Sequence, residues 1–119
     1  CRGPIKHLSQ AALDDPRVTV VCDDVARYLK VAGPATYDAI VLDLYEGPNS
    51  ATDAVNDPFY GRKALTLFAR ALKTRGTLAV WSEQTDRGFE ERLRRSGFKP
   101  ELLRPGRGGL RHAVYLAQL

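Results

Sequence analysis

Apolar residues form short continuous runs that alternate with stretches of helical spacing. Runs typical of buried strands occupy residues 17–22, 38–42 and 77–81, and the first of them, RVTVVC, is rich in β-branched residues. Between the runs, apolar residues recur at the spacing of one side of an amphipathic helix. This alternation predicts an α/β domain with a mainly parallel sheet.

Residues that start and stop helices set the other expected boundaries. Asp57-Pro58 is a typical helix start, with a capping carboxylate and proline at the first helical position, and Gly76 lies where a glycine commonly ends a helix. The apolar stripe of this helix comprises Ala64, Leu65, Leu67, Phe68, Ala71 and Leu72. The expected helices cover residues 5–13, 25–31, 58–73 and 86–96.

The last two strands are expected to differ from the others in direction. Residues 98–103 and 112–116 both have strand character, and they can pair as an antiparallel hairpin. The link between them, RPGRGGLR, joins two strands rather than a strand and a helix, which indicates a flexible turn rather than a phosphate loop.

Length and composition predict one domain of a soluble protein. The chain has 119 residues, of which 44% are hydrophobic, and no run approaches the roughly 20 apolar residues of a membrane span. No signal-type leader opens the chain, and the two cysteines form no disulfide framework, so we expect a cytoplasmic protein without a membrane partner. The first residue is not Met, which leaves a trimmed or incomplete product open.

Charge and metal-ligand spacing argue against two further classes of partner. The net charge is +4, and many arginines lie late in the chain. No aromatic residues alternate with them as stacking platforms would, so we interpret them as a solvated surface and expect no nucleic-acid partner. No Cys/His cluster has metal-site spacing, and we therefore predict no metal.

Acidic residues follow two of the predicted strands. Asp23 and Asp24 come after VVC, and Asp43 comes after IVL. Ligands of open parallel sheets bind beyond the carboxyl ends of the strands, where these carboxylates can accept hydrogen bonds from amines and hydroxyls or hold a cation. Aspartate after a strand is also a common helix cap, and spacing alone leaves both interpretations open.

The motifs, taken in order, resemble those of a known family. DPRVTVVCDDVARYL, YDAIVLDLYEGP, NDPFYGRKAL, GTLAVWS and FEERLRRSGF are similar to segments of spermidine synthases and spermidine-synthase-like proteins, over nearly the whole chain. The resemblance implies the Rossmann-like class I S-adenosylmethionine-dependent methyltransferase fold. It also implies a donor, S-adenosylmethionine or its decarboxylated form, and a small-molecule amine as acceptor.

The resemblance assigns roles to the strand-end acids. The family's adenine-binding acid matches Asp24, with Asp23 beside it in the cofactor site, and Asp43 matches an acid at the active site that also belongs to the cofactor site. Glu46 stands where aminopropyltransferases carry an aspartate that helps to deprotonate the attacking amine. Glutamate is one methylene longer, and catalytic geometry is sensitive at the ångström scale.

The same resemblance assigns a substrate pocket. Phe59 and Tyr60 match a segment that lines the pocket in the family, and Tyr45 lies between the two acids of the active-site strand end. Whether the protein forms a homodimer is left open.

The resemblance also implies missing parts. The family's first strands, with their glycine-rich nucleotide loop and ribose-binding acid, have no counterpart here, so residues 1–119 are interpreted as a partial nucleotide-binding transferase domain. The missing strands would lie between 17–22 and 38–42, which leaves a gap of roughly 10 Å beyond the normal separation. A fragment of a longer enzyme is favoured over a shifted first strand or a second chain in the gap. A non-catalytic binding or assembly module that retains the fold is the alternative.

Overall fold

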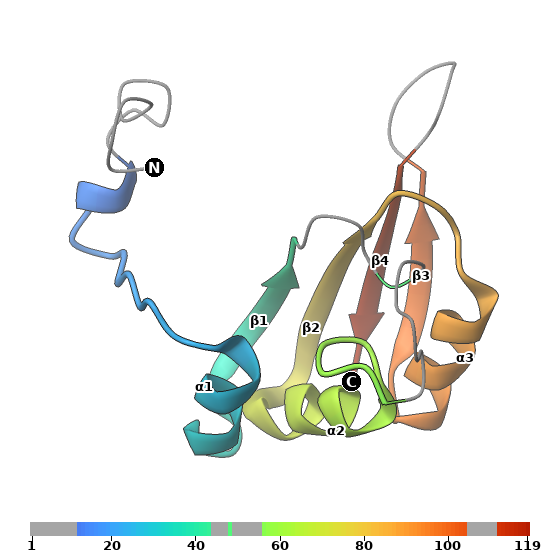
Figure 1. The fold of residues 1–119 in the computed structure, drawn as a ribbon, viewed down its shortest axis with the longest axis horizontal. Helices are drawn as coiled ribbons and strands as arrows, with labels where there is room; N and C mark the ends of the chain where they lie inside the picture. Colours follow the sequence, from blue (N-terminus) through green and yellow to red (C-terminus); the bar gives the residue numbers. More distant parts are fainter. Residues whose placement is uncertain (1–11, 44–47, 49–55, 105–111) are drawn as a thin grey trace.

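The computed structural model describes residues 12–43, 48, 56–104 and 112–119. Figure 1 shows how these residues are arranged. The elements, in chain order, are a short 3-10 helix η1 (Ala12–Asp14), α1 (Val25–Val31), β1 (Tyr37–Leu42), α2 (Arg62–Ala71), β2 (Leu72–Ser82), α3 (Arg87–Arg95), β3 (Lys99–Leu103) and β4 (Ala113–Gln118).

The strands form one sheet in the order β1-β2-β4-β3. β1 and β2 are parallel, with Leu42 opposite Val80, whereas β4 is antiparallel to both β2 and β3. The predicted α/β class and the C-terminal antiparallel hairpin are confirmed. In the part of the chain that the structure describes, the sheet is mixed rather than mainly parallel, because only one of its pairings is parallel.

The predicted strand over residues 17–22 does not form. This segment is extended, and it runs apart from the sheet in Figure 1. Val18, Val20 and Val21 are 42%, 50% and 51% exposed. A β-branched run forms a strand where it can pack on a pleated, half-buried surface, and none of the described strands lies beside this one. The prediction was wrong because this segment has no neighbouring strand among the described residues.

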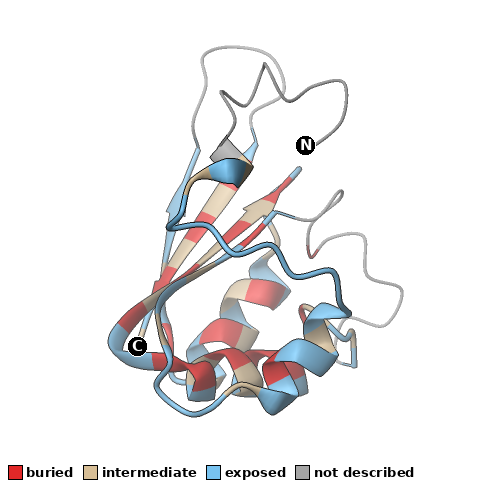
Figure 2. Ribbon diagram, turned by 90° about the vertical axis from the view of Figure 1, so that its left-hand side faces the viewer, coloured by how far each residue is buried: buried red, intermediate tan, exposed pale blue. Residues whose placement is uncertain are grey.

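All three α-helices lie on one face of the sheet (Figure 2). Side chains of β2 alternate between the faces, so Leu78, Val80 and Ser82 are fully buried against the helices, whereas Ala79 and Trp81 are half-buried on the other face. We call these the covered face and the bare face. Val41 of β1, paired with Ala79 and therefore on the bare face, is 71% exposed. Residues 38–42, predicted as a buried strand, are covered on one face only, because no described element packs on the bare face.

The hydrophobic core fills the space between the covered face and the helices. Phe89 packs edge-on against Tyr60 and Tyr115, with ring centroids 5.9 and 5.4 Å apart. The core comprises Leu29, Leu42, Tyr60, Ala64, Leu65, Phe68, Ala71, Leu72, Leu78, Val80, Phe89, Leu93, Phe98, Ala113, Tyr115 and Ala117. The expected stripe of the third predicted helix lies in this core except for Leu67, which is half-buried.

Helix α2 is shorter than predicted at both ends. The Asp57 side chain accepts hydrogen bonds from the backbone N–H groups of Phe59 and Tyr60, at 2.8 and 2.9 Å, and this forms a turn ahead of the helix instead of a cap on it. Gly76 does not end the helix but lies within β2, next to Arg75 with a φ of 66°. A Cβ at Gly76 would lie 2.8 Å from the Lys73 carbonyl oxygen, so this close approach requires glycine.

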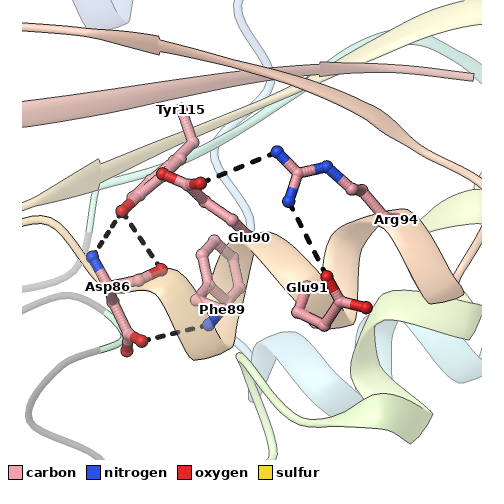
Figure 3. Close-up of polar contacts among 6 residues, drawn as sticks. All are labelled: Asp86, Phe89, Glu90, Glu91, Arg94 and Tyr115. Carbon is pink, nitrogen blue, oxygen red and sulfur yellow. Dashed lines mark hydrogen bonds and ion pairs between the residues drawn. The ribbon is translucent and has the colours of Figure 1, made fainter.

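Helix α3 agrees with the sequence at both ends. Asp86 caps it by accepting from the Phe89 N–H at 3.0 Å, and Gly97, at a φ of 94°, follows its end. The Tyr115 hydroxyl accepts a hydrogen bond of 2.6 Å from the Asp86 N–H, which joins the start of the helix to β4 (Figure 3).

Two arginines of α3, Arg94 and Arg95, are paired with acids on the same helix. Arg94 lies within 3.8 Å of both Glu90 and Glu91, and Arg95 lies 3.4 Å from Glu91. These exposed pairs offset much of the positive charge on this face of the helix.

Candidate functional site

The candidate site lies at the carboxyl ends of the parallel strands β1 and β2. Asp43 follows β1 directly and is exposed. Since Leu42 pairs with Val80, Asp43 lies beside the end of β2 at Trp81. This is the edge of an α/β sheet at which ligands bind, so the sequence placed Asp43 correctly relative to its strand.

A cleft of about 590 Å³ runs along β1 from Tyr37 to Asp43, where it reaches this edge, and residues of the segment 19–29 line it as well. Most of its lining is apolar, and Asp23 and Asp43 both belong to it. The full lining is Thr19, Val21, Asp23, Val25, Tyr28, Leu29, Tyr37, Ala39, Ile40, Val41, Leu42, Asp43 and Phe68. Two of the predicted site acids therefore border the same cleft, although no strand precedes Asp23 in the described residues 12–22.

Asp24 has a structural role in helix α1. Its side chain accepts a hydrogen bond of 2.9 Å from the Arg27 N–H, which makes it the N-cap of the helix. The Asp23 side chain in turn accepts from the Asp24 N–H at 2.8 Å. Capping, one of the two interpretations left open by the spacing, is therefore present. Adenine binding by Asp24 stays a prediction, because a capping carboxylate retains a second oxygen.

Tyr60, which lies near Asp43, is unusual because its hydroxyl group is buried without a hydrogen-bond partner among the described residues. The residue as a whole is 4% exposed. Burial, together with the negative charges of Asp57 and Asp43, raises the pKa of Tyr60 to about 12. At neutral pH the hydroxyl is therefore protonated, and it remains a hydrogen-bond donor.

The turn before α2 holds Tyr60 in place. Its backbone N–H is bound by Asp57, and its carbonyl oxygen accepts a hydrogen bond of 3.2 Å from Arg92 Nε. The ring packs between Phe59 and Phe89. Neither Phe59 nor Tyr60 is among the residues that line the cleft, so their place in a substrate pocket stays a prediction.

Other predicted site residues lie outside the described part of the chain. These are Tyr45 and Glu46, the expected pocket residue and the expected base. In residues 12–43, 48, 56–104 and 112–119, no group of three or more His, Cys, Asp or Glu side chains is placed to hold a metal ion. Within the same residues, no helix has the length and apolarity needed to cross a membrane.

Sequence reasoning missed two tyrosines in the cleft. Tyr28 of α1 and Tyr37 of β1 both line it, and a hydrogen bond between their side chains raises the pKa of Tyr37. The available signal was the position of Tyr28, one helical turn beyond the capping Asp24, which directs it toward the strand that follows.

Curated proteins match part of the chain in sequence. The chain is 34% identical over 73 residues to putrescine N-methyltransferase 1 of Nicotiana tabacum, covering 61% of this chain and 18% of that protein. It is 35% identical over 81 residues to polyamine aminopropyltransferase of Mycobacterium tuberculosis, covering 66% of this chain and 15% of that protein. The match thus spans less than a fifth of the length of these relatives. No protein-family model matches the chain.

A solved structure shows the same fold. A SAM-dependent methyltransferase from Archaeoglobus fulgidus superimposes with a TM-score of 0.64 at 12% identity, covering 88% of this chain and 69% of that one. The predicted resemblance to the spermidine synthase family is confirmed over part of the chain, and the fold is that of a SAM-dependent methyltransferase.

Proposed function

We propose that this chain is part of a transferase that moves an aminopropyl or methyl group from an S-adenosylmethionine-type donor to a small-molecule amine. The observation that carries the proposal is that Asp43, directly after β1, lines the same cleft as Asp23. The relatives named for putrescine and polyamine chemistry support the substrate class. The match spans only a small part of each relative. The donor and the acceptor of this chain are therefore our proposal and are not taken from the names of the relatives.

The residues present suit a positively charged donor and acceptor. Asp43 and Asp23 both supply negative charge to the cleft, and most of its other lining residues are apolar. When bound, the donor would supply an electrophilic carbon next to a positively charged sulfur. Asp23, Asp24 and Asp43 are the residues that would hold it.

Asp43 has the chemistry needed at the acceptor nitrogen. Attack by the amine forms a carbon–nitrogen bond, breaks the carbon–sulfur bond and leaves a proton on nitrogen. A carboxylate beside that nitrogen orients it and attracts or accepts the proton, and Glu46 is the second candidate for this role. We also assign Phe59 and Tyr60, which precede α2, to the acceptor pocket.

An incubation with each donor tests the proposal. The longest expressed form of the protein is mixed with putrescine and either S-adenosylmethionine or its decarboxylated form, and products are identified by mass spectrometry. We expect one donor to be consumed, and we expect Asp43→Asn to lower kcat/KM by at least about 100-fold, the size of a lost acid–base group.

Asp38→Asn is the matched control. Asp38 lies on the same strand at its opposite end, where it is exposed and forms an ion pair of 3.5 Å with Lys73. The Asp38→Asn substitution should leave turnover unchanged. Full turnover by Asp43→Asn would remove Asp43 from the active edge.

A non-catalytic binding module is the second candidate, and the bare face of the sheet is the observation that favours it. Failure of both donors to be consumed, together with binding of neither by calorimetry, would favour this candidate over the transferase.

A further inference from the structure

Helices α1 and α2 carry basic side chains and no acidic ones. Their charged residues are Arg27 and Lys30 in α1 and Arg62, Lys63 and Arg70 in α2, and all five are exposed. None of the five forms an ion pair within the part of the chain that the structure describes. The two helices contact each other in the layer on the covered face (Figure 2), and we call these five residues the basic surface.

Helix α3 of the same layer shows the usual arrangement. Arg94 and Arg95 each lie within 3.8 Å of a glutamate on their own helix. Both signs of charge are typically interspersed on a helix face that is merely solvated. The basic surface departs from this pattern, because its cations have no such partners.

The start of α2 makes the departure sharper. Arg62 and Lys63 lie in the first turn, which contains no acid, and the preceding Gly61 has no side chain with which to cap the helix. The helix dipole places its positive end here, so two further cations disfavour the helix. Helix formation therefore does not explain these side chains, whereas a bound carboxylate would relieve their repulsion.

A hollow of about 310 Å³ lies beside this first turn. Its lining is entirely polar and consists of Asn56, Arg62, Lys63 and Thr66. Such a hollow suits an acidic side chain, since a guanidinium can hold a carboxylate through two parallel hydrogen bonds. Arg70 lies on the same side of α2 as Arg62 and Thr66, at a spacing of four residues, and extends the positive surface along the helix.

An exposed apolar residue indicates which kind of anion fits. Val31 ends α1, one helical turn beyond Arg27 and next to Lys30, and it is 76% exposed. A protein segment can offer carboxylates and apolar side chains together, as protein interfaces do. The phosphates of a nucleic acid offer charge and hydrogen-bond acceptors alone.

We infer that the basic surface docks an acidic segment of a partner protein, with an aspartate or glutamate side chain in the hollow at Arg62 and Lys63. A small-molecule amine is itself a cation, so this surface is separate from the acceptor site of the proposed transferase, and the inference does not rest on that activity. It does not depend on the strands that the family places beside β1 either, because strands extend the sheet in its own plane and leave the outer side of the helices exposed.

Binding of a short fluorescent peptide of glutamate and leucine, followed by anisotropy, tests the inference on the full chain. We expect Arg62→Gln combined with Arg70→Gln to weaken binding at least about fivefold, and we expect added salt to weaken binding to the wild type, because exposed ion pairs are screened. Arg94→Gln combined with Arg95→Gln is the matched control, since it removes the same charge from α3 and should leave the affinity unchanged. Equal weakening by both variants would show that binding follows net charge and would overturn the inference.

Lysine labelling on the unsubstituted chain locates the peptide without relying on a variant. At a free peptide concentration about ten times Kd, Lys30 and Lys63 should react with an amine reagent at least about fivefold more slowly. Lys99, which is exposed on β3, should react at its original rate. Equal protection of all three lysines, or of none, would overturn the inference. Tighter binding of a DNA duplex or of anionic lipid vesicles in the same buffer would also overturn it, since phosphate would then be the preferred anion.

Discussion

The two faces of the sheet differ in what stabilises them, although the same strands supply both. On the covered face, Leu78 and Val80 of β2 are fully buried against α2 and α3. On the bare face, Val41 and Leu103 are 71% and 39% exposed. Their residue types are alike, which shows that the neighbouring elements, and not the hydrophobicity of a run, decide whether a strand residue contributes to the core.

The largest expected effect separates two leucines, one on each face. Leu78→Ala should destabilise the fold by about 3–4 kcal/mol, because it leaves a cavity at a fully buried position. Leu103→Ala should cost about 1 kcal/mol or less, because Leu103 pairs with Val114 on the bare face. Urea unfolding of both variants measures the difference. Equal losses would mean that the bare face is covered in solution.

The pH dependence of stability tests the covered face through Tyr60, which is buried in the core on that face. Burial raises its pKa from 10.0 to about 12, so above pH 10 the unfolded chain releases this proton before the folded chain does. The stabilisation is therefore complete below pH 10 and is lost as the pH rises toward 12, by roughly 2–3 kcal/mol in all. The free energy of unfolding of the wild type and of Tyr60→Phe is measured between pH 9 and pH 12, a range set by that pKa. It should fall less steeply with pH in the variant.

Tyr115 also contributes to the pH dependence of stability, in the wild type and in the variant. Burial raises its pKa as well, so the Tyr60→Phe variant should still lose some stability at high pH. Identical pH profiles for the wild type and the variant would show that Tyr60 is accessible to solvent.

The smallest effects concern the helix caps on the two sides of the molecule. Asp86→Ala and Asp24→Ala each remove a side-chain acceptor from a helix start, worth about 1 kcal/mol. For Asp86 the loss should lower global stability, because α3 is anchored in the core through Phe89 and Leu93. For Asp24 it should mainly raise amide exchange within the seven-residue helix α1.

Asparagine variants at the same positions are the controls. Asn caps a helix about as well as Asp, so Asp24→Asn should preserve α1 while it alters the charge at the cleft. If Asp24→Asn frays the helix as much as Asp24→Ala does, the capping geometry is wrong.

The sequence was informative where the determinants of structure are local. The cap at Asp86 and the turn at Gly97 are set by neighbours in the chain, and the hairpin of β3 and β4 joins two consecutive strands. The position of Asp43 at the end of β1 followed in the same way from a local apolar run.

The sequence was uninformative where distant contacts decide. RVTVVC has strand composition, but whether it pairs depends on a neighbour elsewhere in the chain. Gly76 matches a helix end in spacing, yet its role is a close approach within β2. The environment of Tyr60 depends on Asp43 and Phe89, which lie far from it in sequence and meet only in the folded chain.

Trp81 gives the bare face an optical property of its own. It is the only tryptophan of the chain, it is half-buried on that face, and its ring lies 5.0 Å from that of His112. The intrinsic fluorescence of the protein therefore comes from one indole at the end of β2 that faces away from the helices. Any molecule that settled over the bare face would move this indole into a drier environment, and the emission would shift to shorter wavelengths without any label.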